Sequence, residues 1–176
     1  MDEKALHSVV DAVVRRVTGT LTLETARRLS EAIRAEAARI GVNAVVAISD
    51  RAGRPILVEC MDDAYIASYD IALNKAYTVT ALKMSTSQLK PLAQPGQPLY
   101  GIQFTNQGQI VIFGGGEPLK VGETIVGGLG VSGGSEEQDT ALAAFGKAYF
   151  EQSGGTLYWI STPRTLKRSS ARYSRV

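Results

Sequence analysis

The chain holds one cysteine and one histidine among its 176 residues. A single cysteine excludes an internal disulfide framework, and we expect Cys60, which stands beside Val58 and Met61, to be a small buried apolar residue. A single histidine, His7, excludes a metal centre built from several histidines. It also leaves no imidazole close in sequence to Ser132, the serine of a VSGG segment, so a Ser-His-Asp triad is disfavoured.

Long apolar runs are missing as well. No stretch approaches the roughly 20 residues needed to cross a bilayer, and the N-terminus does not follow the plan of a secretory signal peptide. We therefore expect a cytoplasmic location and no membrane partner. The hydrophobic content of 44% and the charged content of 20% are typical of a globular protein, and 176 residues suffice for one domain with a buried core.

Charge is distributed unevenly along the chain. Residues 161–176 contain five basic residues and no acid, so the net charge of +2 becomes −3 when they are left out. Clustered arginine and lysine favour nucleic acid through counterion release, but this tail has one aromatic residue, Tyr173, and no series for base stacking. We therefore expect a solvated or partner-docking tail and no nucleic-acid partner.

Residues 3–17 predict an amphipathic helix. Its apolar side chains recur at helical spacing opposite Arg15 and Arg16, and they are Leu6, Val9, Val10, Val13, Val14 and Val17. Valine is a middling helix former, so this stripe needs a partner surface. Short helices of this form also guide enzymes into microcompartment shells. An ordinary packing helix or an oligomer contact is the alternative.

Helices and strands are expected through residues 20–152. Helices are predicted from Thr22, as the N-cap, to Gly41, over 65–82, briefly within 83–101, and from Ser135 onward. Strands are predicted at 44–49, 56–61, 109–113, 118–121 and 124–131, with tight turns at 50–54 and 122–123. The inward residues of the helix over 65–82 are expected to be Ile66, Leu73, Ala76 and Thr80. The last helix is expected to carry a capping box of Ser135 and Gln138 and to bury Ala141, Leu142, Phe145, Ala148 and Tyr149.

This order of elements indicates a single α+β domain. Strands in runs with helices grouped around them predict a mostly antiparallel, five-stranded sheet packed with helices. We divide the chain into an N-terminal amphipathic helix (1–19), the domain (20–152) and a C-terminal extension with the basic tail (153–176). Within this extension, residues 156–160 are a candidate extra strand.

Two glycine-dense segments carry the strongest local signal. The first is Gly114-Gly115-Gly116 and the second ends in Gly133-Gly134 directly before a helix start. Glycine lets the backbone approach a ligand or another backbone closely and adopt a positive φ. Such turns are therefore usually built for close contact.

Charged residues near the second segment allow two interpretations. A phosphate is disfavoured there because two glutamates, Glu136 and Glu137, follow the turn and no P-loop lysine is present. Acid–base chemistry would draw on carboxylates and one amine, namely Asp62, Glu136, Asp139 and Lys75. The alternative is that these side chains are helix caps and ion pairs.

The glycine segments belong to a longer ordered set of motifs. The set also contains Leu21-Thr22-Leu23, Asp50-x-x-Gly53, Met61-Asp62, the segment DIALNKA from Asp70 to Ala76, and Pro95-Gly96-x-Pro98-Leu99-Tyr100-Gly101. In this order, over roughly residues 20–150, the chain resembles the GlcG/HbpS-like family, which includes the C-terminal domain of the PduO-type corrinoid adenosyltransferases. The resemblance implies an antiparallel sheet with helices packed on it and assembly into dimers or larger rings.

The resemblance also implies a cofactor, because proteins of this family bind heme and related tetrapyrroles. A heme site needs an apolar slot, an iron ligand and cations for the propionates. Lys75 and Arg51 are candidate cations. His7 is the candidate iron ligand, because some members that resemble the PduO domain use a histidine of an N-terminal helix. The other candidate ligands are Met61, Tyr65, Tyr100 and Cys60, and the candidate backbone contacts are Gly114, Gly115, Gly116, Gly133 and Gly134.

Three functions follow from these observations. The first is a small heme- or tetrapyrrole-binding protein that assists a bacterial microcompartment or a cofactor-dependent catabolic pathway, where the N-terminal helix would contact a shell or enzyme partner. The second is a non-catalytic oligomeric interaction module without a cofactor. The third is a small-molecule enzyme that uses the carboxylates near the second glycine segment.

Overall fold

The computed structural model describes Leu6 and residues 21–153 of the chain. The predicted N-terminal helix, the candidate strand at 156–160 and the basic tail lie outside the described residues. The elements are α2 (Leu23–Arg39), β1 (Val45–Asp50), β2 (Pro55–Cys60), α3 (Ile66–Leu82), α4 (Thr86–Leu92), η1 (Ile102–Phe104), η2 (Asn106–Gly108), β3 (Gly116–Val121), β4 (Thr124–Ser132) and α5 (Glu136–Gln152). No helix in this part of the chain is both long and apolar enough to cross a membrane.

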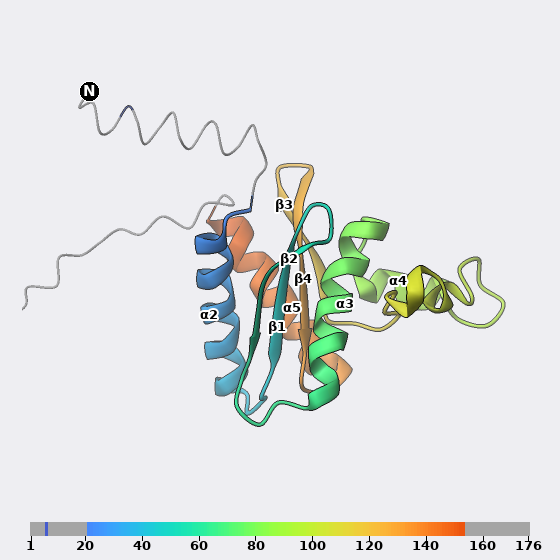
Figure 1. Ribbon diagram of the computed structural model, residues 1–176, viewed down its shortest axis with the longest axis horizontal. Helices are drawn as coiled ribbons and strands as arrows, with labels where there is room; N and C mark the ends of the chain where they lie inside the picture. Colours follow the sequence, from blue (N-terminus) through green and yellow to red (C-terminus); the bar gives the residue numbers. More distant parts are fainter. Residues whose placement is uncertain (1–5, 7–20, 154–176) are drawn as a thin grey trace, which may run out of the picture.

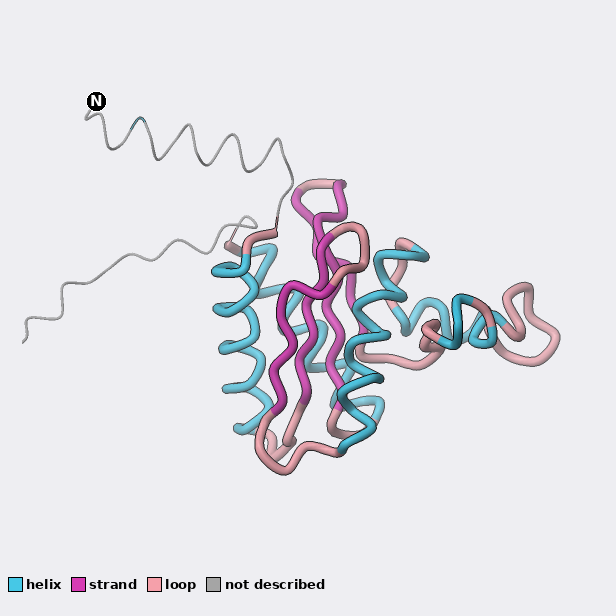
Figure 2. The backbone as a smooth tube through the Cα atoms, in the orientation of Figure 1, coloured by secondary structure: helices cyan, strands magenta, loops and turns pink. Residues whose placement is uncertain are grey.

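One antiparallel sheet organises the domain. Its strand order is β2-β1-β4-β3, and every neighbouring pair is antiparallel. Helices α2 and α5 cover one face of the sheet and α3 covers the other, while α4, η1 and η2 form an arm that projects from the body (Figures 1 and 2). The α+β class is confirmed.

The described sheet has four strands, so the expectation of a strand at 109–113 is wrong. This segment lies against α3 instead: the Val111 N–H donates to Thr78 Oγ1 at 3.0 Å, and the Thr78 hydroxyl donates to the Gln109 carbonyl at 3.2 Å. Ile110 and Val111 are buried there without strand pairing. The side chain of Thr78 thus pairs with backbone groups of this segment that would otherwise bond to a neighbouring strand.

Helix α2 begins and ends as the sequence predicts. The Thr22 hydroxyl accepts from the Thr25 N–H at 3.2 Å, and Gly41 follows the helix with a φ of +72°. Its buried residues recur on one face and include Ala26, Leu29, Ile33 and Ala37. They join β1 and β4 in the main hydrophobic core.

The buried face of α5 differs from the predicted one. The capping box at Ser135 is present, but the helix buries Leu142, Ala143, Gly146 and Phe150. Of the predicted set only Leu142 is buried; Ala141, Phe145, Ala148 and Tyr149 are exposed. The cause is Gly146, where a Cβ would lie 2.6 Å from Ile33 Cδ1 and 2.8 Å from Leu129 Cδ2. Because this glycine lets α5 approach the core closely, it selects the face that turns inward.

Three further residues differ from their predicted burial. Ile66, predicted to face inward, is 96% exposed because it begins α3 beyond the sheet, and Leu73 is half-buried. Cys60, predicted to be buried, is exposed at the end of β2, an edge strand that pairs on one side only. Apolar residues at element ends and sheet edges therefore remain on the surface.

Candidate binding site at the glycine turns

A buried ion pair lies where the two glycine segments meet. Lys75 projects from α3 toward β4 and is fully buried, and its ammonium donates to Asp139 Oδ2 at 2.9 Å and to the Val131 carbonyl at 2.7 Å. The same nitrogen lies 4.9 Å from the centroid of the Phe113 ring. Burial lowers the pKa of Lys75, while the Asp139 carboxylate acts in the opposite direction.

The first glycine turn packs directly on this ion pair. Gly115 has a φ of +105°, and a Cβ there would lie 2.6 Å from Lys75 Nζ and 2.8 Å from the Val131 carbonyl oxygen. Its own carbonyl accepts from the Val131 N–H at 2.8 Å. The flanking Gly116 N–H donates to Thr86 Oγ1 at 2.9 Å. The turn is therefore closed against protein and presents no free backbone cradle at these positions.

The second glycine turn is hydrogen-bonded to α5 and packs on the α2–β1 connection. The Gly134 N–H donates to Asp139 Oδ1 at 2.9 Å, and a Cβ on Gly133 would lie 2.4 Å from the Asn43 carbonyl oxygen. Glu136 joins the two turns, because it accepts from Gly114 N–H at 2.9 Å and from Lys90. Its pKa is lowered, first by the Lys90 hydrogen bond and then by the Gly114 N–H.

A cavity of about 470 Å³ opens beside the second turn. Its walls come from the α2–β1 connection, the segment before α3 and the first turn of α5, and they include Asn43, Asp63, Tyr65, Gly134 and Gln138. The walls are mostly polar. A volume of this order suits a small-molecule ligand, and the polar groups would fix its orientation.

The structure separates the remaining predicted site residues. Met61 packs against the core, where its sulfur accepts from the Ala44 N–H at 3.4 Å. Tyr100 lies exposed in the projecting arm. Arg51 lies in the β1–β2 turn, whose Gly53 packs on Tyr77 near the far end of α3 from the cavity. His7 lies outside the described residues.

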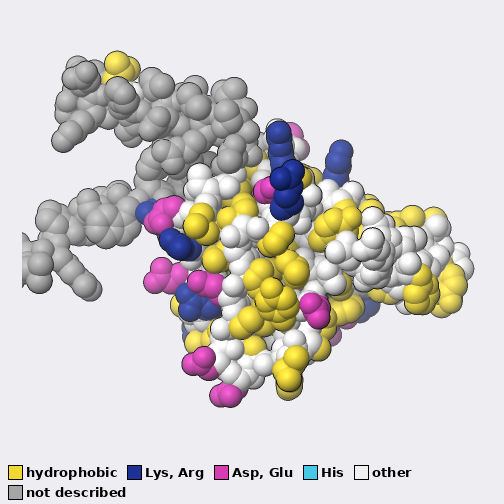
Figure 3. All heavy atoms as spheres, in the orientation of Figure 1, with side chains coloured by type: hydrophobic (Ala, Val, Ile, Leu, Met, Phe, Trp, Pro, Cys, Tyr) yellow, Lys and Arg dark blue, Asp and Glu magenta, His cyan; other side chains and the backbone are white. Residues whose placement is uncertain are grey.

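Exposed aromatic and aliphatic side chains border the cavity and cover the arm. Tyr65 lines the cavity and is 73% exposed, and Ile66 and Tyr69 follow it on α3. In the arm, Phe104 is 82% exposed. Figure 3 shows hydrophobic side chains gathered over β2 and α3 and again on the arm. These surfaces could hold an apolar partner that the polar cavity alone could not.

Several cavity residues escaped the sequence analysis. Asn43, Asp63 and Gln138 are ordinary polar residues of connections and helix starts, and only their spatial neighbours make them cavity walls. Asp63 adopts a φ of +61°, a conformation in which aspartate is more common than most residues, but only the structure reveals it. The described residues hold no group of three or more His, Cys, Asp or Glu side chains that could bind a metal ion.

Residues 21–148 match the family model described as "Haem degrading protein HbpS-like". The chain belongs to the HbpS-like family. It is 46% identical over 124 residues to an uncharacterised 15.0 kDa protein of Citrobacter freundii from the dhaT-dhaS intergenic region, which covers 70% of this chain and 87% of that protein. It is 36% identical over 141 residues to the corrinoid adenosyltransferase PduO of the same organism, covering 80% of this chain. The match spans only 42% of PduO.

Solved structures agree with this membership. Klebsiella pneumoniae protein ORFY is 43% identical with a TM-score of 0.73, covering 74% of this chain and 90% of that one. The PduOC:heme complex is 38% identical with a TM-score of 0.71, covering 73% and 94%. A double mutant of Streptomyces reticuli HbpS is 28% identical with a TM-score of 0.66, covering 74% of this chain and 86% of that one. About three quarters of this chain thus share a fold with these solved structures.

Proposed function

We propose that this protein is a small heme- or tetrapyrrole-binding protein that works without catalysing a reaction of its own. The observation that carries the proposal is the similarity to PduOC, a chain solved as a heme complex and matched over 94% of its length. The PduO relatives connect the proposal with corrinoid metabolism. Because the match spans less than half of PduO, the adenosyltransferase activity is not part of the proposal.

The site that fits such a ligand best is the cavity together with its apolar border. The cavity walls supply polar groups, and Tyr65 and Ile66 supply the exposed apolar surface that a porphyrin face requires. For iron, His7 remains the preferred ligand, and the Tyr65 hydroxyl is the alternative that already lines the cavity. Met61 is disfavoured because its sulfur is engaged and packed against the core. A bound heme would supply redox or gas-binding chemistry at the iron.

The engagement of the carboxylates favours binding over catalysis. Asp139 is bonded to Lys75 and to the Gly134 N–H, and Glu136 is bonded to Lys90 and to the Gly114 N–H. A general acid or base must reach its substrate, and Asp139 is buried beneath the turns. These contacts weaken the hypothesis of an enzyme built on these residues.

The proposal includes self-association and an accessory role in a bacterial microcompartment or a cofactor-dependent pathway in the cytoplasm. The exposed Ile66 and Phe104 support self-association, because large apolar side chains on the surface mark contact sites. The same residues favour the second candidate, an oligomeric interaction module without a cofactor. In either case the N-terminal helix would offer a contact to a shell or enzyme partner.

Titration of the full chain with hemin separates these candidates. We expect a Soret shift that saturates at one heme per chain, with light scattering giving at least a dimer. Tyr65→Phe should leave the spectrum unchanged, whereas His7→Ala should abolish a low-spin, nitrogen-ligated spectrum, and Met61→Leu serves as the matched control. No saturable binding by the parent chain would overturn the heme proposal and leave the interaction module.

A further inference from the structure

Helix α5 carries a second apolar face that the described residues leave uncovered. Ala141, Phe145, Ala148 and Tyr149 recur at helical spacing, and all four are exposed, whereas Gly146 and Phe150 are buried. Phe145 and Tyr149 stack with their ring centroids 6.3 Å apart and are each 38% exposed. A helix that is apolar on two faces has a second packing partner.

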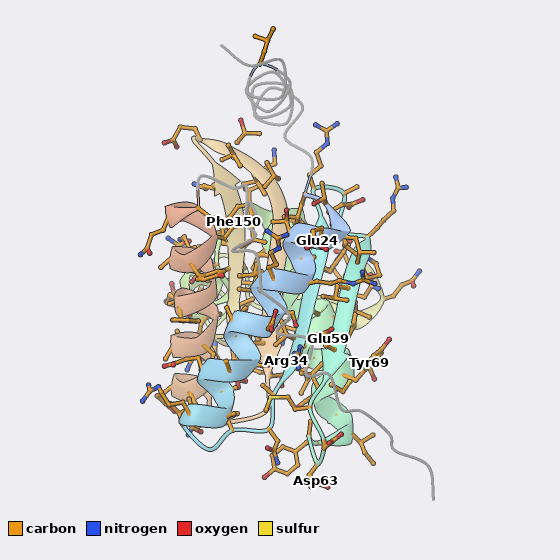
Figure 4. All side chains as sticks on the ribbon, turned by 90° about the vertical axis from the view of Figure 1, so that its left-hand side faces the viewer. Glu24, Arg34, Glu59, Asp63, Tyr69 and Phe150 are labelled. Atoms are coloured by element: carbon orange, nitrogen blue, oxygen red, sulfur yellow. The ribbon has the colours of Figure 1, made fainter. Side chains whose placement is uncertain are left out.

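Tyr149 of this face lines a groove between α5 and α2. The two helices lie side by side on the same face of the sheet (Figure 4). A cavity of about 520 Å³ lies between Tyr149 and one outer face of α2, which runs from Glu24 to Ala35. Within that face Ala32 and Ala35 are small and allow close approach, and the other lining residues are charged: Glu24, Arg27, Arg28 and Glu31.

We propose that residues 3–17 occupy this groove as a helix antiparallel to α2 of the same chain, with the valine stripe on Tyr149 and the α2 alanines. The lengths agree: Glu24 to Ala35 and Leu6 to Val17 are each twelve residues, and the eleven steps between their ends rise by about 17 Å in a helix. The segment ends directly before α2, and residues 18–22 give a connection of the length found in αα-hairpins. Val17 then lies near Glu24, and Leu6 lies near Ala35.

The chain's own N-terminal segment fits better than the other apolar segment outside the described residues. Residues 156–160 are predicted to be a strand, and a single strand between two helices would leave its backbone N–H and C=O groups without partners. A helix satisfies its backbone internally. A segment tethered at Leu21 also has a high effective concentration at the groove.

Docking in this groove has two consequences for the N-terminal segment. It hides the valine stripe, so an outside partner that binds this stripe must compete with the groove. It also carries His7 toward the end of the molecule where the glycine-turn cavity opens, because Gly41, just after α2, lines that cavity.

Cysteine cross-linking without heme tests the proposal independently of the proposed function. In a Cys60→Ser background, Val10→Cys with Ala32→Cys should form an intrachain disulfide on mild oxidation, seen at monomer mass and mapped by peptide mass spectrometry. Val10→Cys with Ala52→Cys is the control, because Ala52 is an exposed alanine in the β1–β2 turn and is more accessible than the half-buried Ala32. Disulfides only between chains would assign the groove to a second copy, and no disulfide would leave the stripe free for an outside partner; either result overturns the proposal.

A thermal-melting cycle gives a second readout. Ala32→Glu and deletion of residues 1–19 should each lower Tm by about 2–4 °C. Combined, they should lower it no further, because both remove the same contact. Ala52→Glu should leave Tm unchanged in both backgrounds. Fully additive effects of Ala32→Glu and the deletion would contradict docking in the groove.

Discussion

Two ion pairs at the start of α5 combine the same chemistry with different burial. Lys75–Asp139 joins α3 to α5 with side chains 0% and 4% exposed, whereas Lys90–Glu136 joins α4 to α5 with side chains 48% and 30% exposed. Each carboxylate also accepts a glycine-turn N–H, Asp139 from Gly134 and Glu136 from Gly114.

The difference shows how burial sets the role of a charged group. Water screens the outer pair, so its net contribution to stability is small. The inner pair has no solvent, and removal of one partner leaves the other buried alone. Glu136 and Asp139 are only three residues apart on α5. The Lys90–Glu136 pair is therefore a weak surface contact, whereas the packing of both glycine turns depends on the Lys75–Asp139 pair.

The largest expected effect comes from breaking the inner pair. Asp139→Ala should destabilise the domain by about 3–5 kcal/mol in urea unfolding, because Lys75 loses its partner and Gly134 N–H loses its acceptor. The double variant Lys75→Met with Asp139→Leu should be less destabilised, because it buries no charge. Equal stability of Asp139→Ala and the parent would show that the inner pair behaves like the outer one.

Replacing one glycine in each turn tests the packing from the backbone side, since Gly115 packs on the inner pair and Gly133 packs on the α2–β1 connection. Gly115→Val and Gly133→Val should each destabilise by at least about 1–3 kcal/mol, because their side chains would meet Lys75 or the Asn43 carbonyl. Gly96→Ala is the control: its φ is +79° but no atom lies within 4 Å of its Cβ position. The control therefore measures the cost of the positive φ alone. If both valine variants melted at the same temperature as the parent, this would contradict the close packing at the two glycines.

The smallest effect concerns the outer pair and depends on pH. The folded pKa of Glu136 lies below its ordinary value of 4.5, so its contribution is present above about pH 4.5 and is lost as the pH falls through the folded pKa. Glu136→Gln should therefore reduce stability by at most about 1 kcal/mol at pH 7. The difference from the parent should vanish at low pH. Urea unfolding at several pH values measures it, and a difference that grows on acidification would contradict the assigned sign.

Local signals predicted most of the fold. The caps at Thr22 and Ser135, the Asp50–Arg54 turn and the Gly122–Glu123 hairpin all form within a few residues, so sequence patterns suffice to find them. The strand predicted at 109–113 is wrong because this segment bonds to the Thr78 hydroxyl, which lies on a helix distant in the sequence. Such a bond has no local signature.

The candidate site was predicted in part. Lys75, Gly115 and Gly134 lie around Asp139 in a closed and internally bonded cluster, and contact of the predicted residues with a cofactor stays a prediction. The open cavity beside them uses residues without a distinctive pattern, such as Asn43 and Asp63. Sequence spacing identifies residue types that favour close contact, but it does not tell whether protein or ligand makes that contact.

The sequence by itself determined the family, the α+β class and the helix caps, because these rest on ordered motifs and on hydrogen bonds within a turn or two. Only the tertiary structure decided that Lys75 is closed off by Asp139 and that Phe145 and Tyr149 face outward. Both outcomes depend on how closely the elements approach. Gly115 and Gly146 fix that approach, since a single Cβ at either position would collide with residues from other elements.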